Sequence, residues 1–235
     1  GTQTAFERQA TQVELDFQGT QAALSQNATA VALGFATEAP SPELQQLDAT
    51  PSPDPLFNES FTTGLNTGLW TYSDISDWSL NVNGGLIAVG QRAWLLTERE
   101  DFQTYTIETV ILPVAGQPGF YYILLNTGVD HGLGVEIYHD GERVTTTGLY
   151  RVNRTQIDTD SLLSNQNLSL VQTVQTTFAP TTRITIQTQV SSERIVVFVD
   201  GTTTLDVALD APPPSGAIGV YIPINAGIER INVVG

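Results

Sequence analysis

Arg183–Gly201 reads RITIQTQVSSERIVVFVDG, and this stretch decides the fold class. In its first half, apolar residues alternate with polar ones, which is the two-residue period of a strand that buries one face. Its second half, Ile195–Val199, is apolar at every position, so we expect this strand in the middle of a sheet or beneath a covering segment. Asp200-Gly201 then predicts a hairpin turn, because glycine supplies the positive φ of a primed turn. The stretch therefore predicts a β-meander.

The same pattern continues through residues 56–235. Short runs of alternating or continuous apolar residues are separated by turn signals such as Asn83-Gly84-Gly85 and Asp140-Gly141. Many short strands at this spacing predict a mainly β domain, an antiparallel β-sandwich of the jelly-roll type. Trp70 and Trp78 are expected in its core.

Residues 1–35 differ from this domain, because they contain no proline and are rich in Ala, Gln and Thr. Apolar residues recur there at steps of mostly three and four, which predicts a long N-terminal helical arm with an apolar stripe. The stripe must be covered, either by the chain's own sheet or by neighbouring copies of the helix. Alternation from Thr11 to Phe17 leaves a strand open as well, paired with a neighbour's sheet edge. The residues expected to mediate self-association into a homo-oligomer are Phe6, Ala10, Val13, Phe17, Leu24 and Val31.

Residues 36–55 are expected to form a linker between the arm and the sandwich. They contain five prolines, which favour stiff and extended backbone: Pro40, Pro42, Pro51, Pro53 and Pro55. The predicted order is a helical arm at 1–35, a linker at 36–55 and a β-sandwich domain at 56–235.

The charge balance excludes several kinds of partner and chemistry. The formal net charge is -16, from 25 acidic residues against nine arginines, so nucleic acid is not expected as a partner. The chain has no lysine and no cysteine, which excludes Schiff-base chemistry, disulfides and thiolate nucleophiles. No apolar run approaches the ~20 residues of a membrane span.

Several segments resemble strands of the concanavalin A-like, laminin G-like jelly rolls. They are Phe57–Phe61, Trp78–Leu86, Phe102–Glu108, Ile195–Gly201 and Gly216–Val220. The resemblance implies the jelly-roll fold, in a superfamily that includes lectins, glycosidases and adhesion modules. The composition of residues 1–35 resembles the stalks that follow a membrane anchor in some bacterial surface proteins. We therefore expect an extracellular or cell-surface location, with an anchor ahead of this chain.

The carboxylate pattern of the glycosidases in this superfamily is missing from the sandwich. Those enzymes place two or three acids on alternate residues of one strand, as acid and nucleophile. The nearest match, Glu14-Leu15-Asp16, lies in the arm and lacks the last acid. Glu136 and Asp140 are interpreted as solvated, and His131 and His139 as ordinary surface or loop histidines. The sequence therefore predicts that the protein is not an enzyme.

Sugar and calcium sites are the binding sites that the residues suggest. Exposed aromatic rings stack on sugars, and the candidate ligand-binding residues are Trp94, Tyr122 and Tyr138. In Tyr121-Tyr122 the alternation allows only one ring to face outward. Calcium prefers clustered carboxylates, and the best local cluster is Asp158 with Asp160. No other cofactor is expected.

The leading hypothesis is a non-catalytic extracellular or structural protein, in which the arm mediates anchoring or self-assembly of a jelly-roll head. A lectin-like module that binds glycans is the first alternative. A glycoside hydrolase-like enzyme is the second, and it requires a pair of carboxylates facing each other across a cleft at ~5–10 Å.

Overall fold

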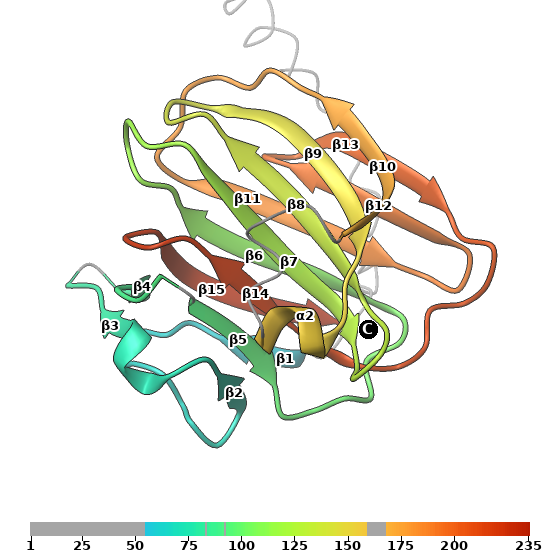
Figure 1. Cartoon of the computed structure of the whole chain (residues 1–235), viewed down its shortest axis with the longest axis horizontal. Coiled ribbons are helices and arrows are strands. Elements are labelled where there is room, and N and C mark those ends of the chain that lie inside the picture. The colour runs from blue at the N-terminus through green and yellow to red at the C-terminus, as the bar shows by residue number, and fades with distance from the viewer. Residues whose placement is uncertain (1–54, 83, 92, 159–167) are drawn as a thin grey trace, which may run out of the picture. The chain divides into compact units, whose positions relative to one another are not determined.

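The computed structural model describes residues 55–82, 84–91, 93–158 and 168–235. In these ranges the chain forms two antiparallel sheets stacked as layers, with sheet B toward the viewer in Figure 1. The predicted helical arm and nearly all of the linker lie outside the described residues. The same holds for the six residues expected in self-association, Phe6, Ala10, Val13, Phe17, Leu24 and Val31.

Sheet A contains eight of the described strands. Their order across the sheet is β13 (Thr202–Ala208), β12 (Arg194–Val199), β11 (Ile184–Val190), β6 (Tyr105–Leu112), β15 (Gly227–Val234), β4 (Leu86–Ala88) and β3 (Trp78–Leu80). The remaining strand, β1 (Pro55–Glu59), also pairs with β15.

Sheet B contains seven of the described strands and forms the second layer. Their order is β10 (Ser169–Gln175), β9 (Val144–Arg151), β8 (Leu133–His139), β7 (Gly119–Thr127), β14 (Ala217–Ile222), β5 (Ala93–Thr97) and β2 (Trp70–Tyr72). Two short helices interrupt the strands, a 3-10 turn η1 (Ile75–Asp77) and α2 (Arg154–Asp158). The antiparallel β-sandwich expected from the sequence is confirmed.

Strands β11 and β12 show how far the residue pattern predicts burial. In β11, Ile184, Ile186 and Val190 are buried in the core, as the alternation predicts. Strand β12 lies inside sheet A between β11 and β13, as expected, but no described segment covers its outward face fully, since Val196 and Phe198 are half-exposed. This strand lies next to the edge strand β13, and its outward residues belong to the open outer face of sheet A.

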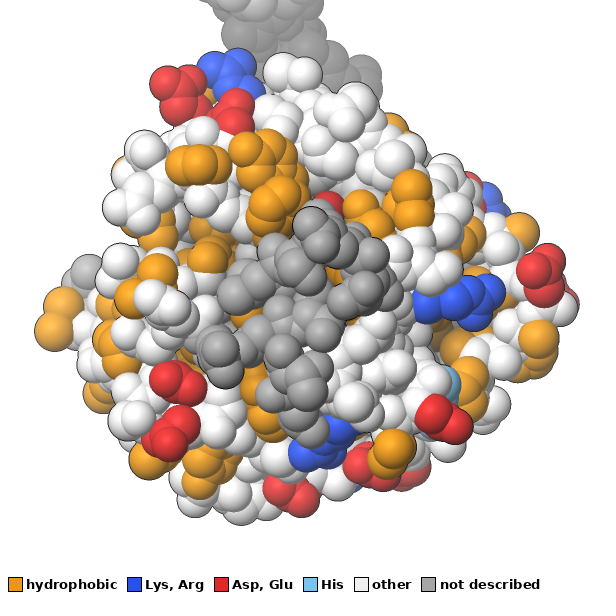
Figure 2. All heavy atoms as spheres, in the orientation of Figure 1, with side chains coloured by type: hydrophobic (Ala, Val, Ile, Leu, Met, Phe, Trp, Pro, Cys, Tyr) orange, Lys and Arg blue, Asp and Glu red, His pale blue; other side chains and the backbone are white. Residues whose placement is uncertain are grey.

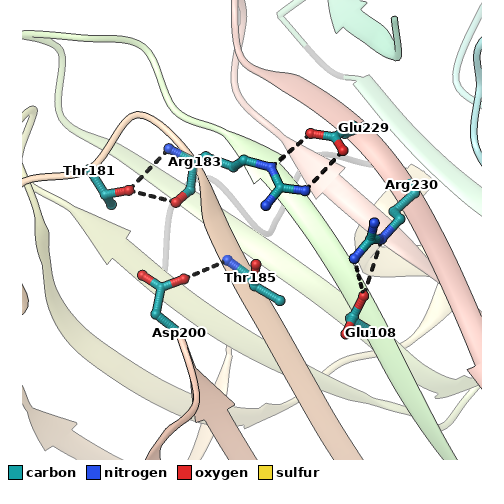
Figure 3. Close-up of polar contacts among 7 residues, drawn as sticks. All are labelled: Glu108, Thr181, Arg183, Thr185, Asp200, Glu229 and Arg230. Carbon is teal, nitrogen blue, oxygen red and sulfur yellow. Dashed lines mark hydrogen bonds and ion pairs between the residues drawn. The ribbon is translucent and has the colours of Figure 1, made fainter. Parts of the chain in front are cut away.

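The predicted hairpin turn after β12 is confirmed. Asp200 and Gly201 have φ angles of 47° and 77°, and both lie in the left-handed region that a primed turn requires. The Asp200 carboxylate accepts a hydrogen bond from the backbone N–H of Thr185 at 2.8 Å (Figure 3). The turn is therefore tied to the start of β11.

Ion pairs occupy the outer face of sheet A (Figure 3). Arg183 binds both carboxylate oxygens of Glu229 at 2.9 Å, and Arg230 donates to Glu108 at 2.6 Å. Exposed pairs of this kind contribute about 0–1 kcal/mol each to stability. They show that arginines of this acidic protein are commonly held by a neighbouring carboxylate.

The core lies between the sheets and contains both tryptophans predicted there. Trp70 is 1% exposed and Trp78 is 8% exposed. Phe57 packs edge-on against the Trp70 ring, with 5.1 Å between the ring centroids. Within the described ranges, no helix has the length and apolar character needed to cross a bilayer.

Candidate functional site

The outer face of sheet B carries a row of large side chains on neighbouring strands. The row contains Trp94 of β5, Tyr221 of β14, Tyr122 of β7 and Glu136 of β8, in that order across the sheet. Each of these residues lies directly opposite the next in the strand pairing. Because residues directly opposite in a ladder point to the same side, the four side chains form one continuous row. Figure 2 shows this face in space-filling form, with hydrophobic side chains in several separate groups.

Helix α2 covers part of this face. Ile157 is fully buried in a cluster with Trp94, Tyr122 and Tyr221, separate from the core between the sheets. The helix begins with a reciprocal cap: the Asn153 side chain accepts from the Gln156 N–H, and the Gln156 side chain accepts from the Asn153 N–H, both at 2.9 Å. This capping box fixes the start of a helix too short for its period to show in the sequence.

Glu136 is a buried carboxylate at the end of this row. It is 3% exposed, so its interpretation as a solvated residue is wrong. Its oxygens accept hydrogen bonds from the Tyr122 hydroxyl at 2.5 Å and from the Tyr150 hydroxyl at 3.4 Å. Burial, followed by the bond to Glu136, raises the pKa of Tyr122 above its usual value, so this hydroxyl remains a donor. Among all strand residues of sheet B, Glu136 is the one acid.

The neighbouring row on the same face is more open. Phe120 pairs with Tyr138, Tyr138 with Thr146, and Thr146 with Gln175, across β7, β8, β9 and β10. The rings of Phe120 and Tyr138 lie 4.7 Å apart between centroids and are tilted by 32°. Both rings are half-exposed, and Gln175 is exposed. The Thr146 hydroxyl donates to the Gln175 side-chain oxygen at 3.1 Å. The result is an aromatic surface bordered by a hydroxyl and an amide, here called the open row.

The candidate ligand-binding residues thus divide between the two rows. Trp94 and Tyr122 are 8% and 0% exposed, so neither offers an open ring face, whereas Tyr138 belongs to the open row. Tyr121 faces the core and Tyr122 the outer face, as the alternation predicts. A role in ligand binding remains a prediction for all three candidates. Phe120 is not a candidate in the sequence analysis, and the signal that identifies it is its position directly opposite Tyr138 in the β7–β8 pair.

The candidate calcium residues are only partly described. Asp158 ends α2, and Asp160 lies outside the described residues. In the described ranges, no group of three or more His, Asp or Glu side chains is arranged to hold a metal ion. Calcium binding at Asp158 and Asp160 therefore remains a prediction.

The two histidines have different environments. His139 is 1% exposed at the end of β8 and accepts a hydrogen bond from the Gly141 N–H at 3.2 Å, so its interpretation as a surface or loop residue is wrong. Burial lowers its pKa. His131 lies in the loop before β8 and is half-exposed, as expected.

Comparison with known proteins identifies the architecture. No protein-family model and no curated protein sequence matches the chain. Among solved structures, the carbohydrate binding module CBM66 from Bacillus subtilis is similar, with a TM-score of 0.52 and 13% identity over 71% of this chain and 95% of that one. The domain has the concanavalin A-like fold.

Two glucanases share this fold. The β-glucanase of Bacillus licheniformis has a TM-score of 0.55 at 12% identity, over 76% of this chain and 97% of that one. A glycoside hydrolase family 16 endo-glucanase from Bacteroides ovatus has a TM-score of 0.57 at 10% identity, over 76% of this chain and all of that one. Identities this low establish the fold alone, so the function of this concanavalin A-like domain must be argued from its own residues.

Proposed function

We propose that this chain is a non-catalytic carbohydrate-binding domain and that the open row of Phe120, Tyr138, Thr146 and Gln175 binds the sugar. The carrying observation is the half-exposed ring pair beside a hydroxyl and an amide. The apolar faces of sugar rings pack on aromatic side chains, and hydroxyl and amide groups both donate to and accept from sugar hydroxyls. Proteins named as carbohydrate-binding or glucan-hydrolysing share the fold, which supports this class of ligand.

The charge of the site favours a neutral glycan. The four residues of the open row are Phe, Tyr, Thr and Gln, so the row contains no acidic or basic side chain. The chain carries a formal net charge of -16, which repels anionic polysaccharides over a longer range. Neutral glucans are therefore the first ligands to test.

The non-catalytic part of the proposal rests on Glu136. Glycoside hydrolysis by two carboxyl groups requires a separation of about 5–5.5 Å for retention or about 6.5–9.5 Å for inversion. The strands of sheet B supply a single carboxylate, and two tyrosine hydroxyls already bind it in a buried site. In this arrangement the Glu136 carboxylate is engaged by hydroxyls of β7 and β9 and holds three strands of the outer face together.

The direct test is binding of soluble β-1,3-1,4-glucan, measured by affinity electrophoresis and isothermal titration calorimetry. Tyr138→Ala and Phe120→Ala are expected to weaken binding at least about tenfold, because each removes half of the ring surface. Phe198→Ala is the matched control, since Phe198 is also half-exposed but lies on the outer face of sheet A. Equal affinity in all three variants, or no binding across a broad array of neutral glycans, would refute the proposal.

A second assay separates binding from hydrolysis. The wild-type protein and Glu136→Gln are incubated with the same glucan, and released reducing ends are measured. The proposal expects no release above the background of the buffer with either protein. Release by the wild-type protein that Glu136→Gln abolishes would instead support the glycoside hydrolase alternative.

An extracellular or cell-surface location belongs to the same proposal. It is supported by the class of ligand, because soluble and structural polysaccharides are encountered chiefly outside the cell. Labelling of intact source cells with a membrane-impermeant carboxyl-reactive reagent tests it, since the chain has 25 acidic residues and no lysine. Labelling only after lysis would contradict the location.

A further inference from the structure

A cavity lies at the opposite end of strand β8 from the open row. It has a volume of about 270 Å³, near the lower end of the ~300–1,000 Å³ typical of small-molecule sites. Its walls come from the ends of β8, β9 and β10 on one side and from the loop after β13 on the other. The apolar residues that line it are Leu133, Leu149, Val171, Leu209, Pro212, Pro213 and Pro214.

The wall formed by the proline loop is held in a fixed position. The Asn126 side-chain amide donates to the backbone oxygens of Pro214 at 3.0 Å and Phe102 at 2.8 Å. Its oxygen accepts from the buried Tyr105 hydroxyl at 2.9 Å. Proline has a fixed φ and adds little further freedom to the loop. The cavity is therefore formed before any ligand arrives, which lowers the entropic cost of binding.

Arg151 lies exposed at the rim of this cavity, and within the described ranges it forms no ion pair with an acidic side chain. Of the seven arginines in the described residues, the other six each lie within 4 Å of a carboxylate, Arg99, Arg143, Arg154, Arg183, Arg194 and Arg230. In a protein with 25 acidic residues, a guanidinium left without one is available to an external anion.

His131 adds further positive character to the same rim. Its Nδ1 lies 3.0 Å from an Asp130 carboxylate oxygen, and its Nε2 lies 3.2 Å from the Ser215 backbone oxygen. Both neighbours are acceptors, so the ring satisfies both contacts only when each nitrogen carries a proton. Asp130 beside this ring and the exposed Asp210, which lines the cavity, offset the charges of His131 and Arg151. Because Asp130 already contacts His131, Arg151 is the cationic group at the rim that an external carboxylate can reach.

We propose that this cavity binds a small apolar monocarboxylate, with the apolar part between Leu133, Leu149 and the proline loop and the carboxylate on the Arg151 guanidinium. The planar guanidinium can donate two parallel N–H bonds to the two carboxylate oxygens. The apolar walls select for an alkyl or aromatic body, and the Arg151 guanidinium favours a carboxylate over a neutral head group. This site lies between the sheets, so the inference does not depend on glycan binding at the outer face of sheet B.

The test uses the full chain and three probes of similar size: hexanoate, hexanamide and hexylamine. Ligand-observed NMR titrations give their dissociation constants. We expect hexanoate to bind at least about tenfold more tightly than hexanamide and hexylamine, because one charge-assisted hydrogen bond between its carboxylate and Arg151 contributes about that much to affinity. Arg151→Gln should remove this preference and leave hexanamide binding unchanged. Arg143→Gln, which alters an arginine already paired with Glu142, is the matched control and should behave as wild type.

A second variant tests the cavity itself. Ala211 is an exposed lining residue, so Ala211→Phe can fill the mouth without disturbing the core and should abolish binding of both hexanoate and hexanamide. Any of three results would overturn the proposal. The first is equal binding of hexanoate by Arg151→Gln and the wild-type protein. The second is hexanoate binding that survives Ala211→Phe, and the third is no hexanoate binding by the wild-type protein at any accessible concentration.

Discussion

Replacing Tyr122 with phenylalanine provides the sharpest measurement of what the Glu136 site contributes to the domain. The substitution removes one hydroxyl from a buried aromatic ring and leaves the ring itself in place. The lost contact is a 2.5 Å hydrogen bond to a carboxylate that is 3% exposed. Hydrogen bonds to charged groups contribute about 1.5–3 kcal/mol, so Tyr122→Phe should lower the free energy of unfolding by that amount.

The neighbouring residue supplies the control. Tyr121 is equally buried but points into the core, where the Val114 backbone is its polar neighbour and no carboxylate of the described residues accepts from its hydroxyl. Tyr121→Phe removes the same atom without removing such a bond, so its effect should stay within about 1 kcal/mol. Urea unfolding followed by tryptophan fluorescence measures both variants, and Trp94 lies in the same cluster as Tyr122. In thermal unfolding, the Tyr122→Phe loss corresponds to about 3–12 °C.

A double-mutant cycle with Glu136→Gln isolates the pair. If the hydroxyl acts on the carboxylate, the two substitutions together should cost less than the sum of their separate effects by about 1 kcal/mol or more. Additive effects would mean that the short contact contributes nothing specific. A Tyr122→Phe loss no larger than that of Tyr121→Phe would refute the reasoning in the same way.

Other measurements test other parts of the molecule. Gly219→Ala should destabilise the domain by about 3 kcal/mol or more in urea unfolding, because a Cβ there would lie 1.9 Å from the Leu95 backbone oxygen; a stable variant would show that the β5–β14 contact is loose. The Asp130 carboxylate raises the pKa of His131. The protonated ring contacts the Ser215 backbone oxygen, so this contact stabilises the fold fully below pH ~6.5, and the contribution is lost as pH rises through the folded-state pKa of His131. His131→Gln should therefore lose more stability at pH 5.5 than at pH 8.5, and equal losses would contradict this. Light scattering should show the full chain larger than a monomer and residues 56–235 monomeric, whereas two monomers would exclude assembly through the arm.

The sequence predicts the sandwich well because strand burial has a local pattern. Alternation in β11 identifies the inward side chains, and the glycine after Asp200 identifies the turn. What the pattern cannot report is whether another segment covers the outer face. Trp94 and Glu136 occupy outward positions, where solvent exposure is the ordinary expectation, yet both are buried.

The burial of Trp94 and Glu136 on the outer face has one recognisable signal in the sequence. Asn153 and Gln156 have the spacing of a capping box, which marks the start of α2. A helix of a single turn has no longer periodicity to support this interpretation, and the three-residue strand β2 is likewise too short to show a period in the sequence. Tertiary contacts across β7, β8 and α2, which no local pattern encodes, bring Tyr122 and Glu136 together.

The placement of Ile157 over the tyrosine row has a consequence for polymer recognition. A polysaccharide crossing the whole width of sheet B would have to pass where this side chain is already packed. The open row instead lies on the far side of Glu136, toward the end of β8 and the start of β9. Such a surface suits the tip of a chain or a short branch, so oligosaccharides of a few units should compete as effectively as the long polymer.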